Sequence, residues 1–132
     1  VKNKSMELRV EKNFSEKIPK IIADPMQLQQ VFLNLMFNAI EAMPLGGVLS
    51  ITTKYNKESS DILISLKDTG KGMDETTLAN IFNPFFTTKR EGTGLGLSIS
   101  RRLIEDHGGD ISVQSVPDKG TEFNIVLKTE NE

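Results

Sequence analysis

The chain has 132 residues, the length of one domain with a substantial hydrophobic core. Its 16 basic and 18 acidic residues give a net charge of −2, so no overall field attracts it to nucleic acid or a membrane surface. It contains no Cys, which excludes disulfides, thiolate zinc sites and Cys nucleophiles. No apolar run approaches the roughly 18 residues of a membrane-spanning helix. We therefore expect one domain over residues 1–132, without direct contact to nucleic acid or membrane.

The first third of the chain predicts two short strands followed by a long helix. Apolar and charged residues alternate over residues 6–11, as in a half-exposed strand, and residues 19–23 are a second short candidate. Asp24 suits an N-cap, Pro25 suits the first helical position, and no Gly or Pro follows until Pro44. We therefore expect a helix over residues 24–43.

This helix is apolar on most of its surface, which predicts that it is buried. Five polar side chains recur along it at spacings of 3, 4, 4 and 3, and they fall within a stripe about 80° wide. A buried helix with one polar stripe is expected to line a polar site, unless the stripe simply faces solvent. The stripe consists of Gln27, Gln30, Asn34, Asn38 and Glu41.

The middle of the chain predicts an antiparallel hairpin and a short helix. Residues 48–55 and 61–67 are the strands, and the polar residues 56–60 join them. Asp68 continues the parity of the apolar positions of the second strand, so its carboxylate should lie at the end of the core face. Asp74 can cap a short helix over residues 75–81.

The last third predicts a loop, a helix and a second hairpin. Residues 82–92 lack a sustained period, which is typical of a mobile loop, and residues 83–91 are expected to become ordered when a ligand binds. A helix should run from about residue 95 to 107, and strands should cover residues 111–116 and 121–128. Hairpins without regular βαβ units predict an α+β two-layer sandwich, with one mostly antiparallel mixed sheet covered on one face by about three helices.

Three glycine-containing stretches suggest ligand chemistry, although each has an ordinary structural explanation. In residues 68–73 the buried carboxylate of Asp68 can accept a hydrogen bond from an exocyclic amine, and the glycines allow the backbone to approach a flat ring closely. An ordinary tight turn has the same sequence pattern. Residues 92–97 open a helix, where free N–H groups bind phosphate, or they form a hinge. Gly120-Thr121 alone says little. A Rossmann fingerprint would need Gly at position 97, where Leu stands, and no P-loop is present.

Four segments in order resemble the four boxes of the ATP-binding domains of sensor histidine kinases. They are Asn34-Leu-Met-Phe-Asn38-Ala, Asp68-Thr-Gly-Lys-Gly72, Phe82-Asn-Pro-Phe85 and Gly92-Thr-Gly-Leu-Gly96. These domains belong to the Bergerat-fold (GHKL) superfamily, which includes DNA gyrase and MutL. The resemblance extends from about residue 6 to residue 127. The sequences of residues 38–42 and 85–89 most resemble those of the nitrogen-regulation type of sensor kinase.

The resemblance implies a role for each of these segments. Asn38 would bind Mg²⁺, and Asn34 would lie beside Asn38. Lys89 or Arg90 would reach the phosphates from the lid, which is the loop of residues 83–91 that would become ordered with nucleotide. The catalytic set would thus be Asn34, Asn38 and Lys89. Asp68 would read adenine, and Phe82, with Phe85 and Phe86, would anchor the lid. The remaining ATP-binding positions implied are Gly70, Gly72, Met73, Gly92, Thr93, Gly94, Leu95, Gly96, Leu97 and Thr121.

Position 34 favours phosphotransfer over hydrolysis. In the hydrolysing relatives a Glu one turn before the metal-binding Asn activates water, whereas Asn34 cannot act as a base near neutral pH. The alternatives are a gyrase- or MutL-like ATPase, an anti-sigma-type serine kinase, and a degenerate domain that only binds partners. The anti-sigma-type kinases usually also carry the Glu.

A histidine kinase also needs a phosphoacceptor His on a helical dimerisation domain. The only His of this chain, His107, ends a helix, where completing the apolar stripe is a sufficient role. The expected partners are therefore the dimerisation domain of a parent kinase and, indirectly, a response regulator. The first residue is Val, as in a piece of a longer protein. The domain is expected to be cytoplasmic, and whether its parent is anchored in a membrane is left open.

Overall fold

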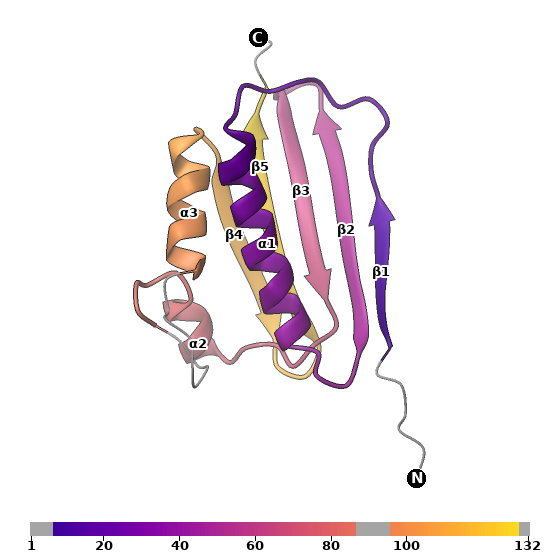
Figure 1. Cartoon of the computed structure of the whole chain (residues 1–132), viewed down its shortest axis with the longest axis vertical. Coiled ribbons are helices and arrows are strands. Elements are labelled where there is room, and N and C mark those ends of the chain that lie inside the picture. The colour runs from indigo at the N-terminus through magenta and orange to yellow at the C-terminus, as the bar shows by residue number, and fades with distance from the viewer. Residues whose placement is uncertain (1–6, 87–95, 130–132) are drawn as a thin grey trace.

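A computed structural model describes residues 7–86 and 96–129, and it confirms the predicted α+β sandwich (Figure 1). One sheet forms the first layer, and α1 and α3 lie across one of its faces, with α2 at the lower end of the molecule. The elements are β1 Leu8–Asn13, α1 Pro25–Glu41, β2 Gly47–Asn56, β3 Asp61–Asp68, α2 Glu75–Asn80, α3 Gly96–Asp106, β4 Asp110–Val116 and β5 Gly120–Lys128.

The sheet has the strand order β1-β2-β3-β5-β4. β1 pairs with β2 in parallel, and the other neighbours are antiparallel, so the sheet is mixed as expected. At one end, Asp68 of β3 lies opposite Leu49 of β2 on one side and opposite Thr121 of β5 on the other. Thr121 in turn lies opposite Ser115 of β4. Paired residues project from the same face of a sheet, so these side chains form one row across four strands.

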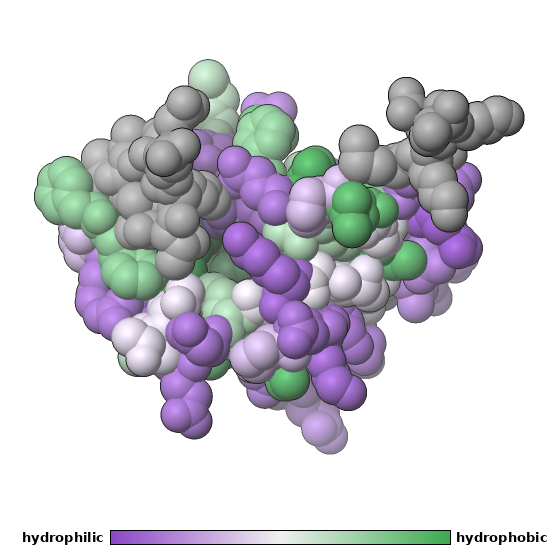
Figure 2. All heavy atoms as spheres, turned by 90° about the horizontal axis from the view of Figure 1, so that it is seen from below, coloured by the Kyte–Doolittle hydropathy of each residue, from purple (hydrophilic) through white to green (hydrophobic). Residues whose placement is uncertain are grey.

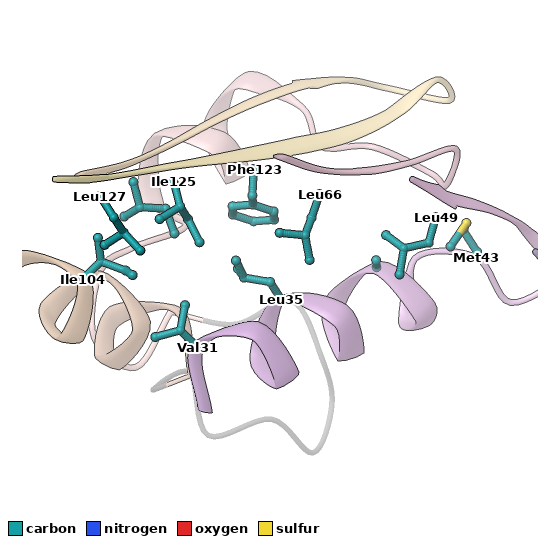
Figure 3. Close-up of a cluster of buried hydrophobic side chains, with 11 residues drawn as sticks. Val31, Leu35, Met43, Leu49, Leu66, Ile104, Phe123, Ile125 and Leu127 are labelled. Carbon is teal, nitrogen blue, oxygen red and sulfur yellow. The ribbon is translucent and has the colours of Figure 1, made fainter. Parts of the chain in front are cut away.

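The hydrophobic core lies between the sheet and helices α1 and α3 (Figure 3). Leu66 and Phe123 point from the strands toward Leu35 of α1, and Ile104 of α3 meets Leu127 near one end of the core. Residues of both helices and of four strands thus hold α1 in a fixed position above β3 and β5. The buried members are Val31, Leu35, Ala39, Met43, Leu49, Leu66, Ile104, Ile111, Phe123, Ile125 and Leu127.

Helix α1 begins as predicted, with Asp24 as its N-cap accepting from the backbone N–H of Met26 and Gln27. The expectation that this helix is buried on most sides was wrong. Only three of its residues are buried, because the sheet covers one side of the helix and no second layer of described residues covers the other. The outer apolar residues Met26, Leu33, Phe37 and Ile40 are exposed.

The predicted strand over residues 19–23 was also wrong. After β1 the chain crosses the ends of the neighbouring strands on its way to α1 (Figure 1), so none of the described strands runs alongside this segment. Ile21 still packs against the core. The other predicted elements are present with ends shifted by one or two residues. None of the helices in the described ranges has the length and apolar character that a membrane crossing requires.

Candidate nucleotide-binding site

A cavity of about 410 Å³ lies at the end of the molecule where α1 ends and β5 begins. Figure 2 views the molecule from this end and shows hydrophilic and hydrophobic side chains intermingled there. The walls come from α1 and the residues after it, the end of β3 and the residues after it, α2 and its C-cap, the start of α3 and the start of β5. They are Asn38, Ile40, Glu41, Ala42, Pro44, Asp68, Lys71, Gly72, Met73, Thr77, Ile81, Leu97, Thr121 and Phe123.

Asp68 is a buried carboxylate at the wall of this cavity, where the alternation of β3 predicted it. Its Oδ1 accepts from the backbone N–H of Gly70 at 2.8 Å and of Thr121 at 3.3 Å. Burial raises the pKa of Asp68 above 3.8, and these two hydrogen bonds oppose that rise. Both of these bonds end on Oδ1, so within the described residues the second oxygen, Oδ2, is left for a donor in the cavity that Asp68 lines.

The glycines that follow Asp68 bring the backbone close to α1 and to the turn between β4 and β5. A Cβ on Gly70 would overlap the carbonyl group of Ala42, and the next N–H, of Lys71, donates to that carbonyl oxygen at 3.0 Å. Gly72 has a φ of +68°, and a Cβ there would overlap the backbone of Val116. Gly72 lines the cavity, whereas Gly70 packs against the end of α1.

The two Asn residues of α1 have different surroundings. Asn38 is half-buried and lines the cavity. The Nδ2 atom of Asn34 donates to the carbonyl oxygen of Gly96 and to the Oγ of Ser100, both at 3.2 Å. Asn34 therefore ties α1 to the first turn of α3. Gln30, by contrast, is exposed, so the predicted polar stripe lines the cavity only toward its C-terminal end.

The other predicted site residues differ in where they lie. Met73, Leu97 and Thr121 line the cavity, whereas Phe82 packs edge-on against Phe123, a wall residue, with ring centroids 6.4 Å apart. Phe85 is 75% exposed. Six further predicted residues lie outside the described residues, as does part of the predicted mobile loop over residues 83–91. These residues are Lys89, Arg90, Gly92, Thr93, Gly94 and Leu95.

His107 lies at the opposite end of α3 from Gly96 and joins two helices. Its Nδ1 lies 2.8 Å from the carbonyl oxygen of Leu103, and its Nε2 accepts from the backbone N–H of Asp24 at 3.0 Å. The carbonyl can only accept, so this pair of bonds requires the neutral tautomer with the proton on Nδ1. Both ring nitrogens are thus engaged, which supports a structural role for His107.

We expect His107→Ala to lower the free energy of unfolding by about 0.5–1.5 kcal/mol, the net value of a typical hydrogen bond. Nucleotide affinity should not change, because the cavity lies beyond the opposite end of α1. Urea denaturation and nucleotide titration measure the two effects. His107→Gln retains an acceptor and serves as the matched variant. An unchanged unfolding midpoint in His107→Ala would show that the link to Asp24 contributes nothing to stability.

Several wall residues were not predicted from the sequence. Ile81 and Phe123 form apolar parts of the wall, and their apolar periodicity indicated only a core position. Ser115 lies behind the wall, where its Oγ accepts from Met73 N–H at 2.8 Å and lies 2.7 Å from Thr121 Oγ1. Ser115 has the parity of Val113 in β4, so its position on the inner face was available from the strand pattern.

The fold and this cavity together define an α+β sandwich domain with a buried carboxylate in the wall of a cavity at the edge of its sheet. Residues 23–131 match the family described as histidine kinase-, DNA gyrase B-, and HSP90-like ATPase. The chain belongs to this family, and it is an ATP-binding domain of the histidine kinase type.

Two of the similar proteins are kinases by name. Sporulation kinase E of Bacillus subtilis (strain 168) is 50% identical over 112 residues, which are 85% of this chain and 15% of that protein. Sensor histidine kinase ZraS of Escherichia coli (strain K12) is 43% identical over 123 residues, 93% of this chain and 26% of that protein. The chain thus spans about a quarter or less of these relatives.

Solved structures agree with the fold. The nucleotide-free catalytic domain of histidine kinase ThkA superposes with a TM-score of 0.79 at 35% identity, covering 94% of this chain and 80% of that domain. Full-length ShkA in complex with AMPPNP superposes with a TM-score of 0.80 at 31% identity, covering 91% of this chain and 25% of that protein.

Proposed function

We propose that this chain binds ATP with Mg²⁺ in the cavity and donates the γ-phosphate to a histidine on a separate helical dimerisation domain. The observation that carries the proposal is the buried carboxylate of Asp68, which lines the cavity and is held by Gly70 and Thr121 through one oxygen, so that the other is left for a donor group of a ligand. Adenine has an amine at its 6-position that can donate to this oxygen, whereas guanine has an acceptor there. The site should therefore prefer ATP to GTP.

The phosphates would extend from the base toward Asn38 and the start of α3. The N–H groups at a helix N-terminus attract phosphate, and the glycines of residues 92–96 precede this one. Asn38 offers a carboxamide oxygen to a hard cation shared with the phosphates. No group of three His, Cys, Asp or Glu side chains in the described ranges could hold a metal, so the Mg²⁺ would depend on Asn38 and on ATP itself.

Phosphoryl transfer breaks the bond between the γ-phosphorus and the bridging oxygen, releases ADP and forms a bond to the acceptor nitrogen. Catalysis of this step is mainly positioning and charge neutralisation, which Asn38, and Lys89 in its family role, would supply. Hydrolysis would need a base for water. At position 34 the chain has a carboxamide whose Nδ2 is bonded to Gly96 and Ser100, which argues against a gyrase-like ATPase.

The acceptor must come from outside this chain. His107, at the far end of α3 from Gly96, has both ring nitrogens in hydrogen bonds. We infer that residues 1–132 are one catalytic domain, that its partners are the dimerisation domain of its parent kinase and, through it, a response regulator, and that the domain works in the cytoplasm. The resemblance of residues 38–42 and 85–89 supports a nitrogen-regulation-like subtype.

Incubation with γ-labelled ATP and magnesium, with and without that dimerisation domain, tests the proposal. The isolated chain should bind ATP, hydrolyse it very slowly and remain unlabelled. Adding the dimerisation domain should produce acid-labile label on the added domain, as expected for phosphohistidine. Rapid phosphate release by the chain alone would support an ATPase instead, label on His107 would overturn the need for a separate acceptor, and a failure to bind ATP would indicate a degenerate domain.

A further inference from the structure

Ser115 lies behind the base-reading edge of the cavity, at a junction of three hydrogen-bonding groups. Its Oγ accepts from the backbone N–H of Met73 at 2.8 Å. It also lies 3.0 Å from the carbonyl oxygen of Gly120 and 2.7 Å from the hydroxyl oxygen of Thr121. Ser115, Thr121 and Asp68 are directly paired across β4, β5 and β3, so the junction continues into the row that ends at the carboxylate.

The Ser115 hydroxyl has one proton and two neighbouring acceptors. In one arrangement it donates to Gly120, and Thr121 donates back to Ser115, so that only lone pairs of Thr121 face the cavity. In the other arrangement it donates to Thr121, and the proton of Thr121 is free to point into the cavity. The N–H of Met73 occupies a lone pair of Ser115 in both arrangements.

The second arrangement is the one that complements adenine. It places a donor, the Thr121 hydroxyl, beside an acceptor, the Asp68 carboxylate. The edge of adenine has the opposite order, with an amine at position 6 that donates and a ring nitrogen, N1, that accepts. We propose that Ser115 is a positioning residue that directs the hydroxyl of Thr121 toward N1, directly or through one water, and thereby completes adenine recognition. This inference rests on the proposed binding of ATP.

Ser115 also keeps the Thr121 hydroxyl away from Asp68. The two residues Thr121 and Asp68 are direct cross-strand neighbours, whose Cβ atoms are typically about 4.5–5.5 Å apart, so rotation of the Thr121 side chain can bring its hydroxyl to the carboxylate. For the hydroxyl of Thr121, the carboxylate of Asp68 is a stronger acceptor than the hydroxyl of Ser115. Without the hydroxyl of Ser115, we expect Thr121 to turn to Asp68, which removes the donor for N1.

The test compares ATP with 1-deaza-ATP, in which a C–H group replaces N1. Wild type should bind 1-deaza-ATP about two- to tenfold more weakly than ATP, the size of one net hydrogen bond. Ser115→Ala should bring this ratio close to one, as should Thr121→Val, and the double variant should show no further change. Ser115→Thr retains the hydroxyl and should restore the wild-type ratio. Ser112→Ala, an exposed Ser on the same strand, is the matched control.

The ratio separates positioning from a merely structural role. If Ser115 only supported Met73, Ser115→Ala would weaken ATP and 1-deaza-ATP equally, and that result would overturn the inference. A wild-type ratio in Ser115→Ala would also overturn it. The triphosphate of purine riboside, which lacks the 6-amine, tests the proposed function separately. If wild type bound it as tightly as ATP, Asp68 would not read the base, and the inference would be lost together with that assignment.

Discussion

Asn38→Ala should leave a folded domain whose phosphotransfer rate is lower by on the order of 100- to 1,000-fold, the range found when one group that stabilises transition-state charge is removed. Asn38 is half-buried at the cavity wall, one turn after Asn34 on the same helix. In the proposed mechanism its carboxamide oxygen holds Mg²⁺ against the phosphates. The adenine end of the cavity, at Asp68, is not altered by this substitution.

The measurement is the rate of labelling of the acceptor domain, together with the affinity for ADP in the absence of magnesium. The rate should fall while that affinity changes little, because the base and ribose contacts remain. Gln29→Ala removes an exposed carboxamide from the same helix and is the matched control. A rate near that of wild type for Asn38→Ala would refute the assignment of the metal site.

Much of the fold followed from local signals in the sequence. Asp24 and Pro25 fixed the start of α1 because capping and the missing N–H of proline are properties of single residues. The alternation along β3 placed Asp68 on the core face because side chains in a strand point to alternate faces. These predictions needed no knowledge of distant contacts.

The errors arose where distant parts of the chain decide the outcome. Helix α1 is apolar over most of its circumference, so its pattern could not show which side meets the sheet, and Phe37 and Ile40 are exposed. The hydrogen bond from Asn34 Nδ2 to the carbonyl oxygen of Gly96, 62 positions away, was not predicted. Such a contact depends on how α3 packs against α1, which no local pattern specifies.

Asp68→Asn should preserve or increase stability at neutral pH while it removes the preference for ATP. Burial raises the pKa of Asp68 above 3.8, so the folded chain binds this proton more tightly than the unfolded chain does. The resulting stabilisation is fully present below pH 3.8 and is lost as the pH rises through the higher pKa of the folded state. At pH 7 the buried carboxylate is therefore a net cost to stability, and the uncharged carboxamide of the variant avoids this cost.

The same substitution changes the hydrogen-bonding character of the cavity. The oxygen of the introduced carboxamide can accept from the N–H groups of Gly70 and Thr121, as Asp68 does, which turns its NH₂ group toward the base. This donor would oppose the amine of adenine but match the carbonyl of guanine. We expect ATP affinity to fall about ten- to hundredfold, the value of a hydrogen bond to a charged group, and the preference to move toward GTP.

Competition binding with both nucleotides measures the change in base preference, and urea denaturation at pH 3 and pH 7 measures the change in stability. An unchanged ratio of ATP affinity to GTP affinity would show that Asp68 does not read the base. A variant less stable than wild type at pH 7 would show that the hydrogen bonds of the charged carboxylate stabilise the fold by more than its burial costs.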